Sequence, residues 1–342
     1  MNQTMDWCNF ENSLKTEARF FNRTAANHLT SIFHGISELQ TRDGRPLVVD
    51  AGPGTDLHTL YRARVFQSDE RLEAALARPD LYLGAPPAPF AAAGRVNARG
   101  ISVFYGANNR RAAIAEVRPP LGSQIAVAQF EIIRKLRLLH LTALSDVRVT
   151  ESLSDFGLAG RIEGAVFLRL LSGRIMRPVM PDDDPFECLA TQAIADFLAT
   201  EASVPIDGII SPSLESGGAD AYVALFHKAA RVEALNVPEG TEISASTGYW
   251  AEDGWVEDYE VVEKIAPLDK DVHENEQEPE SLDFTAIAKA MPLDPRDVDW
   301  REASLRIVPQ NIEVHRVKRA EFATDGFTVK RHRREKRAGI DR

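Results

Sequence analysis

The stretch AAAGRVNARGISVFYGANNRRAAIAEVRP, residues 91–119, sets three large polar side chains, Arg95, Tyr105 and Glu116, among residues that are mostly Gly, Ala and Val. Its middle part, GISVFYGA, has the β-branched and aromatic residues of a short strand. The next part, NNRRAAIAEVR, is typical of a helix, with one of its two asparagines as N-cap and alanines that permit close packing. The stretch therefore predicts a loop, a strand and a helix, each carrying one of the three polar side chains.

The rest of the chain changes irregularly between helix and strand patterns. Apolar residues at helical spacing predict one long or two short amphipathic helices over 11–40, and another helix over 186–200. Strand character extends over further segments, although the second half of the last one is equally compatible with a helix. These segments are 57–66, 123–133, 136–144, 204–216 and 220–235. Because no βαβ rhythm and no repeat is present, the pattern predicts an α+β fold.

Composition sets limits on the class of protein. The chain has 342 residues, of which 44% are hydrophobic and 27% charged, as in ordinary globular proteins. Its formal net charge of −11 argues against nucleic-acid binding by the whole surface. Cys8 and Cys188 lie outside any CxxC motif, which fits reduced thiols. Residues 1–20 lack a signal-peptide pattern, and no segment approaches roughly 18 consecutive apolar residues. We therefore expect a cytoplasmic protein that does not bind membranes.

Several common chemistries lack their motifs. The eight histidines form no HxH or HExxH pattern, so we expect no metal site. No GxGxxG or GxxxxGK[ST] loop follows a strand, and no GxSxG elbow is present. Cys188, inside an apolar helix, is best interpreted as a small core residue. Ser213 ends a predicted strand at a turn, where a hydroxyl can face a cleft, although turn serines are common.

The residues alone leave two questions open. Arg95 and Glu116 could simply pair with each other while Tyr105 packs in the core, or all three could meet in one cleft. The basic end of the chain, VKRHRREKRAGIDR, could bind phosphate backbones of nucleic acid. It is equally compatible with a solvated tail, or with self-association through the acidic stretch at 269–280.

Five segments together resemble the RES-domain family, named for its arginine, glutamate and serine. They are LYRAR (60–64), GRVNARGISVFYGA (94–107), AAIAEVR (112–118), DGIISPS (207–213) and DAYVALF (220–226). The resemblance implies a mixed-sheet core similar to ADP-ribosyltransferases, with a helical N-terminal extension. Family members include toxins of bacterial toxin–antitoxin pairs, and they consume NAD⁺ by hydrolysis or phosphorolysis or transfer its ADP-ribose.

The resemblance also implies site residues and domain limits. Carried over by position, the catalytic residues are Arg95, Tyr105 and Glu116, and the NAD-binding residues are Arg62, Asn97 and Ser213. The chain departs from the family pattern at Val96, Ser211 and Asp220, where many members have Trp, Tyr and Asn. The implied division is a helical extension over 1–50, a RES catalytic domain over 51–265, and a linker with a basic tail over 266–342.

The implied roles agree with the chemistry of NAD⁺. Its nicotinamide is already a cationic leaving group, so the transition state needs help mainly with positive charge on the ribose, which Glu116 would supply. Arg62 and Arg95 would bind the pyrophosphate, Tyr105 would hold the nicotinamide or ribose, and Ser213 would orient an amide or a phosphate.

The resemblance therefore implies an NAD⁺-degrading enzyme, with inorganic phosphate or water as co-substrate, and the sequence shows no metal-binding pattern. The alternatives are an ADP-ribosyltransferase that modifies a macromolecule and a non-catalytic module that binds nucleic acid through the basic tail. By analogy with the family, the partners would be a protein antitoxin and a second copy of the chain.

Overall fold

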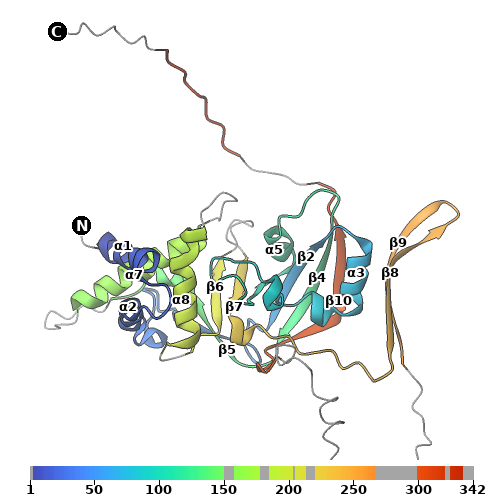
Figure 1. The fold of residues 1–342 in the computed structure, drawn as a ribbon, viewed down its shortest axis with the longest axis horizontal. Helices are drawn as coiled ribbons and strands as arrows, with labels where there is room; N and C mark the ends of the chain where they lie inside the picture. The colour runs from blue at the N-terminus through green and yellow to red at the C-terminus, as the bar shows by residue number, and fades with distance from the viewer. Residues whose placement is uncertain are drawn as a thin grey trace, which may run out of the picture.

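An eight-stranded mixed sheet forms the centre of the protein (Figure 1), seen in a computed structural model that describes residues 3–149, 158–177, 185–202, 205–212, 220–265, 299–319 and 324–333. Neighbouring strands are antiparallel except β5 and β6, which are parallel. In spatial order the strands are β1 (Val48–Ala51), β5 (Leu136–His140), β6 (Gly208–Pro212), β7 (Ala221–Leu225), β3 (Phe104–Ala107), β2 (Thr59–Phe66), β4 (Gln124–Ile132) and β10 (Leu305–Arg316). The predicted α+β class is confirmed.

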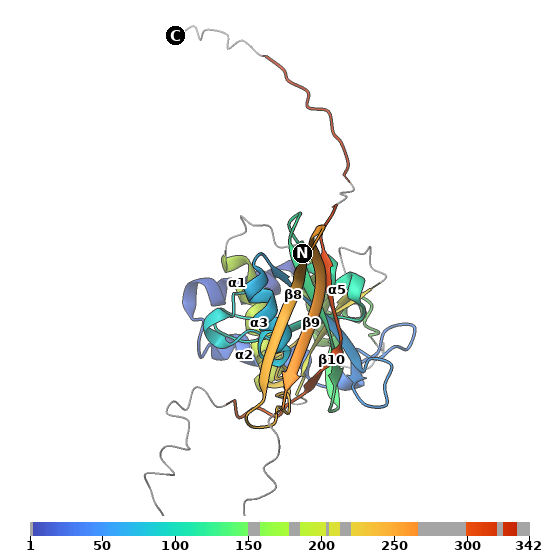
Figure 2. The same cartoon turned by 90° about the vertical axis from the view of Figure 1, so that its right-hand side faces the viewer.

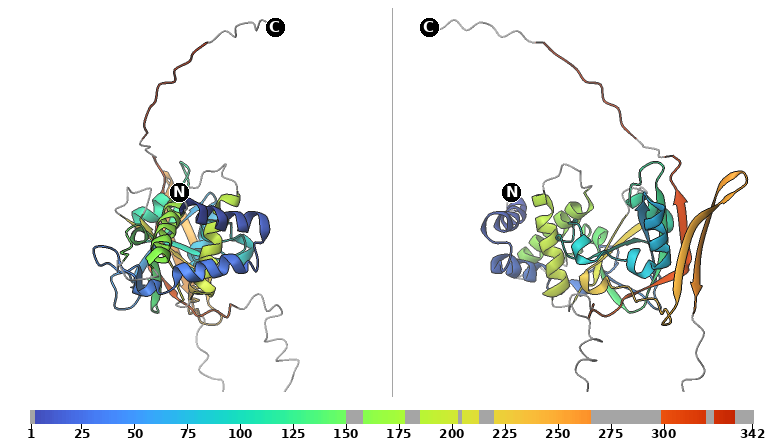
Figure 3. Two further views of the ribbon diagram at one scale, coloured as in Figure 1. Left: turned by 90° about the vertical axis from the view of Figure 1, so that its left-hand side faces the viewer. Right: turned by 45° about the vertical axis from the view of Figure 1, so that its right-hand side comes forward.

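Four helices gather at the β1–β5–β6 end of this sheet (Figures 1 and 3). They are α1 (Gln3–Asn12), α2 (Arg23–Phe33), α7 (Leu158–Met176) and α8 (Leu189–Thr200). In α2 the side chain of Asn22 caps the helix by accepting from the Ala25 amide, and one stripe of apolar residues is buried. Trp7 of α1 packs against Phe167 of α7 with ring centroids 5.0 Å apart. The N-terminal helices therefore share one apolar core with α7, α8 and the sheet.

Short helices cover the opposite end of the sheet, with α3 (Asp69–Ala77) and α4 (Pro79–Tyr82) on one face and α5 (Arg110–Glu116) on the other. Helix α3, followed by α4, buries Leu72 and Leu76 against the aromatic pair Phe104 and Phe130. Helix α5 follows the N-cap Asn109, one of the two asparagines predicted as candidates, whose side chain accepts from the Ala112 amide. Its alanines let it lie close to small residues of β2 and β3.

A two-stranded ribbon, β8 (Glu242–Ala251) and β9 (Gly254–Lys264), projects beside α3 and β10 (Figure 2). Glu73 of α3 accepts hydrogen bonds from the amide and hydroxyl of Thr247, and an ion pair joins Arg316 of β10 to Glu257 of β9. No helix in the described parts of the chain is long and apolar enough to cross a membrane.

The structure differs from the expected elements in several places. Residues 305–316, assigned from sequence to the linker and tail, form β10 and pair with β4 at the edge of the sheet. Within 136–144 only the first five residues are a strand, because α6 (Leu141–Leu144) follows directly. Helix α7 and the ribbon β8–β9 were not among the expected elements. Ser213 lies outside the described residues, as does the acidic stretch at 269–280.

Candidate active site

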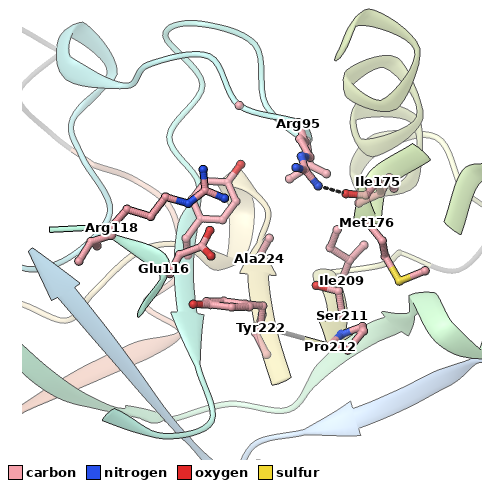
Figure 4. A pocket seen from close by; sticks show the side chains of 15 residues that line it. Arg95, Glu116, Arg118, Ile175, Met176, Ile209, Ser211, Pro212, Tyr222 and Ala224 are labelled. Atoms are coloured by element: carbon pink, nitrogen blue, oxygen red, sulfur yellow. Dashed lines mark hydrogen bonds between the residues drawn. The ribbon is translucent and has the colours of Figure 1, made fainter. Parts of the chain in front are cut away.

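A cavity of about 390 Å³ lies on one face of the β6–β7–β3 part of the sheet (Figure 4). Its floor follows the strand register: Tyr105, Ala224 and Ile209 are cross-strand neighbours. The pair Tyr222 and Ser211, two residues along the strands, therefore faces the same side. The volume lies within the range of small-molecule sites in proteins.

Arg95 forms one side of the cavity from the loop before β3, and α7 and α8 hold this loop in place. The Arg95 guanidinium donates through Nη1 to the Ile175 carbonyl at the end of α7. The Arg95 carbonyl accepts from the Thr191 hydroxyl of α8 at 2.5 Å, and the Gly94 carbonyl accepts from the Gln192 amide at 2.7 Å. Burial lowers the pKa of Arg95 from its usual value. Helix α7 thus fixes the side chain of this arginine, and α8 fixes its main chain.

Asn97 lies behind the cavity wall rather than in it. Its side chain is only 3% exposed. The amide nitrogen donates to the carbonyls of Ala92, Ala98 and Ile101, and its oxygen accepts from the Tyr105 hydroxyl at 2.6 Å. Asn97 therefore closes the loop and orients the Tyr105 side chain. It does not bring Asn97 into the cavity, and the predicted NAD contact stays a prediction.

Tyr105 lines the cavity with its ring, and its hydroxyl points to Asn97. A side chain at Gly94 would collide with this pair, since an added Cβ would lie 2.6 Å from the Asn97 Oδ1 and 2.8 Å from the Tyr105 oxygen. Burial raises the pKa of Tyr105 far above its usual value of 10.0. The phenol therefore stays neutral at physiological pH, which suits an aromatic surface for a ligand ring and not a base.

Glu116 and Arg118 form the side of the cavity opposite Ile175 (Figure 4). Glu116 is the last residue of α5, and the chain then turns so that the Arg118 amide donates to the Ala115 carbonyl at 3.1 Å. Both side chains are exposed to solvent. Arg118 was missed from the sequence, although it stands two residues after the predicted glutamate, in the same EVR motif.

Tyr222 is a second aromatic residue of the cavity that the sequence did not single out. It comes from β7, and Figure 4 shows its ring below Glu116. Its hydroxyl donates to the Ala112 carbonyl of α5, so it ties the helix that carries Glu116 to the floor of the cavity. Its position in DAYVALF, within a strand that contains an alternating pattern, was the available signal.

Arg62 lies on the other face of the sheet. Its neighbour Tyr61 pairs with Ala107, which faces the cavity side, so Arg62 points the opposite way. There its guanidinium lies 5.3 Å from the centre of the Phe104 ring and donates through Nη1 to the Tyr105 carbonyl at 2.6 Å. Burial lowers the pKa of Arg62 to about 10. The structure does not bring Arg62 together with Arg95, and its predicted pyrophosphate contact stays a prediction.

The described residues offer no metal-binding cluster: no three His, Cys, Asp or Glu side chains lie close enough together to hold an ion. The polar side chains of the cavity are arginine, glutamate, tyrosine and serine. These groups can bind an anion, face a planar ring and stabilise a cation, which together suit a charged, ring-bearing organic substrate.

Comparison with protein-family models matches residues 59–246 to the RES domain. The chain belongs to the RES-domain family. This range contains every residue that lines the cavity, whereas α1 and α2 lie before it and β10 after it. The core is thus ADP-ribosyltransferase-like, and RES domains are generally NAD-processing enzymes. No curated protein and no solved structure matches the chain.

Proposed function

We propose that this RES-domain protein degrades NAD⁺ by releasing nicotinamide, with water or inorganic phosphate as the acceptor of ADP-ribose. The observation that carries the proposal is the meeting of Arg95, Tyr105 and Glu116 around one cavity, from the consecutive loop, strand and helix of the stretch 91–119. Family membership supplies the substrate class, and the geometry supports a role for these three residues in binding and reaction.

The reaction needs a negative charge near the ribose, and it needs no proton donor for the leaving group. When the bond between the ribose C1′ and the nicotinamide nitrogen breaks, its electron pair neutralises the departing pyridinium, and positive charge develops on the ribose. Glu116, at the rim of the cavity, would stabilise this charge electrostatically. The acceptor oxygen of water or phosphate then bonds to C1′, and in hydrolysis the water loses a proton to the solvent.

The other two residues have matching roles. The Arg95 guanidinium, oriented by the Ile175 carbonyl, would bind phosphate oxygens of the substrate. Tyr105, neutral and held by Asn97, would present its ring to the nicotinamide or ribose. Because Tyr105 and Tyr222 both face the cavity from adjacent strands, the floor of the cavity offers aromatic surface to a planar ligand ring.

The biological setting rests on the family alone. RES-domain membership supports a cytoplasmic toxin or defence effector that depletes NAD⁺, restrained by a protein antitoxin and assembled with a second copy of the chain. Transfer of ADP-ribose to a macromolecule is the main alternative to degradation. Nucleic-acid binding by the basic tail is a third candidate function. It predicts salt-dependent binding that is lost when the tail, residues 329–342, is deleted.

The test is nicotinamide release from NAD⁺ by the purified full-length protein, with and without inorganic phosphate. Glu116→Gln keeps the shape and removes the charge, so we expect release to fall about 100- to 1000-fold while the melting temperature is unchanged. Arg111→Gln, at an exposed position of the same helix outside the cavity wall, is the matched control and should retain wild-type activity.

Two results would decide against the proposal. If the wild-type protein releases no nicotinamide under either condition, it is not an NAD⁺-degrading enzyme. If labelled NAD⁺ incubated with cell lysate gives a labelled protein or nucleic-acid band in place of free ADP-ribose or its phosphate, the enzyme is a transferase.

A further inference from the structure

Two arginines among the described residues line the cavity, and they come from different elements. Arg95 enters from the loop beside Ile175, and Arg118 enters from the α5 side next to Glu116 (Figure 4). Arg62, which sequence reasoning paired with Arg95, is bonded to the Tyr105 carbonyl on the far face of the sheet. The cation that faces Arg95 in this structure is therefore Arg118.

The backbone places Arg118 in this position by an unfavourable conformation. Its φ is 41°, in the left-handed region that costs free energy for a residue other than glycine. The helix has ended at Glu116 with Val117 as its C-cap, and Pro119 and Pro120 follow, so the chain cannot continue helically. After this turn Arg118 lines the same cavity as Glu116.

The charges around the cavity are suited to an anion. Among the described residues that line it, the charged groups are the guanidinium groups of Arg95 and Arg118 and the carboxylate of Glu116. The pKa of Arg95 is lowered by burial first, and the charge of Arg118 adds to this lowering while that of Glu116 opposes it. Two guanidinium groups that line one cavity match a ligand group with two negative charges.

We propose that Arg118 and Arg95 together bind the diphosphate of NAD⁺, with Arg118 taking the place that sequence reasoning gave to Arg62. This inference rests on the proposed function. The two arginines reach the anion from two sides of the cavity, and the adjacent Glu116 faces the ribose that the diphosphate carries. Arg118 is thus a substrate-binding residue that sets the preference for dinucleotide substrates.

Truncated substrates separate this role from a general effect on catalysis. Nicotinamide riboside has the bond that breaks and lacks both phosphates. For Arg118→Gln we expect the KM for NAD⁺ to rise about ten- to hundredfold, the loss of one charge-assisted contact. The KM and kcat for nicotinamide riboside should be unchanged. Arg111→Gln, on the same helix outside the cavity wall, is the control and should leave both substrates unaffected.

Binding of ADP-ribose, measured by titration calorimetry, makes the test independent of turnover. The Kd of Arg118→Gln should rise by the same factor as the KM. If NAD⁺ is degraded and ADP-ribose binds Arg118→Gln as tightly as wild type, the inference is wrong and the proposed function stands. An equal fall in kcat for both substrates would also overturn it, because Arg118 would then act through Glu116.

The two proposals fail in different ways. If the wild type releases no nicotinamide but binds ADP-ribose in a manner that depends on Arg118, the diphosphate site stands and the proposed reaction falls. If the wild type neither releases nicotinamide nor binds ADP-ribose, both proposals are wrong.

Discussion

The wall of the cavity that carries Arg95 and the wall that carries Glu116 are held by the rest of the protein in different ways. Around Arg95, carbonyls accept hydrogen bonds from side chains of α8, and the buried Asn97 closes the loop with bonds to three more carbonyls. Glu116 and Arg118 lie at the exposed end of a helix of seven residues and in the turn after it. One wall belongs to the folded core, and the other is a surface feature.

This difference tells us which substitutions can be interpreted directly. Changes on the Arg95 wall alter buried hydrogen bonds, so stability and activity should fall together. Changes on the exposed wall leave the core intact, so activity should fall alone, as expected for Glu116→Gln. A substitution that lowers activity without destabilising the protein is therefore the stronger evidence for direct contact with substrate.

The largest effect on stability is expected for Asn97→Ala. The substitution leaves three carbonyls and the Tyr105 hydroxyl without the buried Asn97 side chain as their partner, which should lower the free energy of unfolding by about 3 kcal/mol. Urea unfolding monitored by circular dichroism measures this change. Glu116→Ala is the comparison from the exposed wall and should change stability by less than about 0.5 kcal/mol. Equal destabilisation by the two substitutions would show that the walls do not differ.

A smaller effect is expected for Thr191→Val, which keeps the shape of the side chain. It removes the hydroxyl that donates to the Arg95 carbonyl at 2.5 Å, and we expect a loss of about 1–2 kcal/mol in stability. Because the Arg95 loop is then less firmly held, the KM for NAD⁺ should rise as well. Thr191→Ser retains the hydroxyl and should restore the KM. If Thr191→Val destabilises the protein and leaves the KM unchanged, α8 does not position Arg95.

The sequence predicts the parts of the site that follow a local pattern. The run of small residues between Arg95 and Glu116 indicated a loop, a strand and a helix, and the structure brings the three polar side chains to one cavity. An N-cap at one of the two asparagines before α5, which is Asn109 in the structure, and the strand at 57–66 were also predicted, because capping and alternation are local signals.

Features that depend on distant pairing or on loop geometry were not predictable in this way. The alternation along β2 puts Arg62 and Tyr61 on opposite faces, but only the sheet order shows which face holds the cavity. The direction of Arg118 depends on one positive φ before a proline. Strand β10 comes after the acidic stretch at 269–280 and pairs with β4, which is far away in the sequence. No local pattern predicts such a pairing.

The smallest effect is expected for Tyr105→Phe, and its pH dependence tests how deeply the Arg95 wall is buried. At pH 7 the loss of the hydrogen bond to Asn97 should cost about 1 kcal/mol of stability. Burial raises the pKa of Tyr105 above its unfolded value of 10.0, so the native phenol keeps its proton at a pH where the unfolded one loses it. The stabilisation is therefore complete below pH 10 and declines above it, by up to about 1.4 kcal/mol per pH unit. Unfolding measured from pH 8 to pH 11 should show the wild type converging on Tyr105→Phe near pH 11. A constant difference across this range would mean that the hydroxyl ionises as freely in the native protein as in the unfolded chain, which a core-like wall forbids.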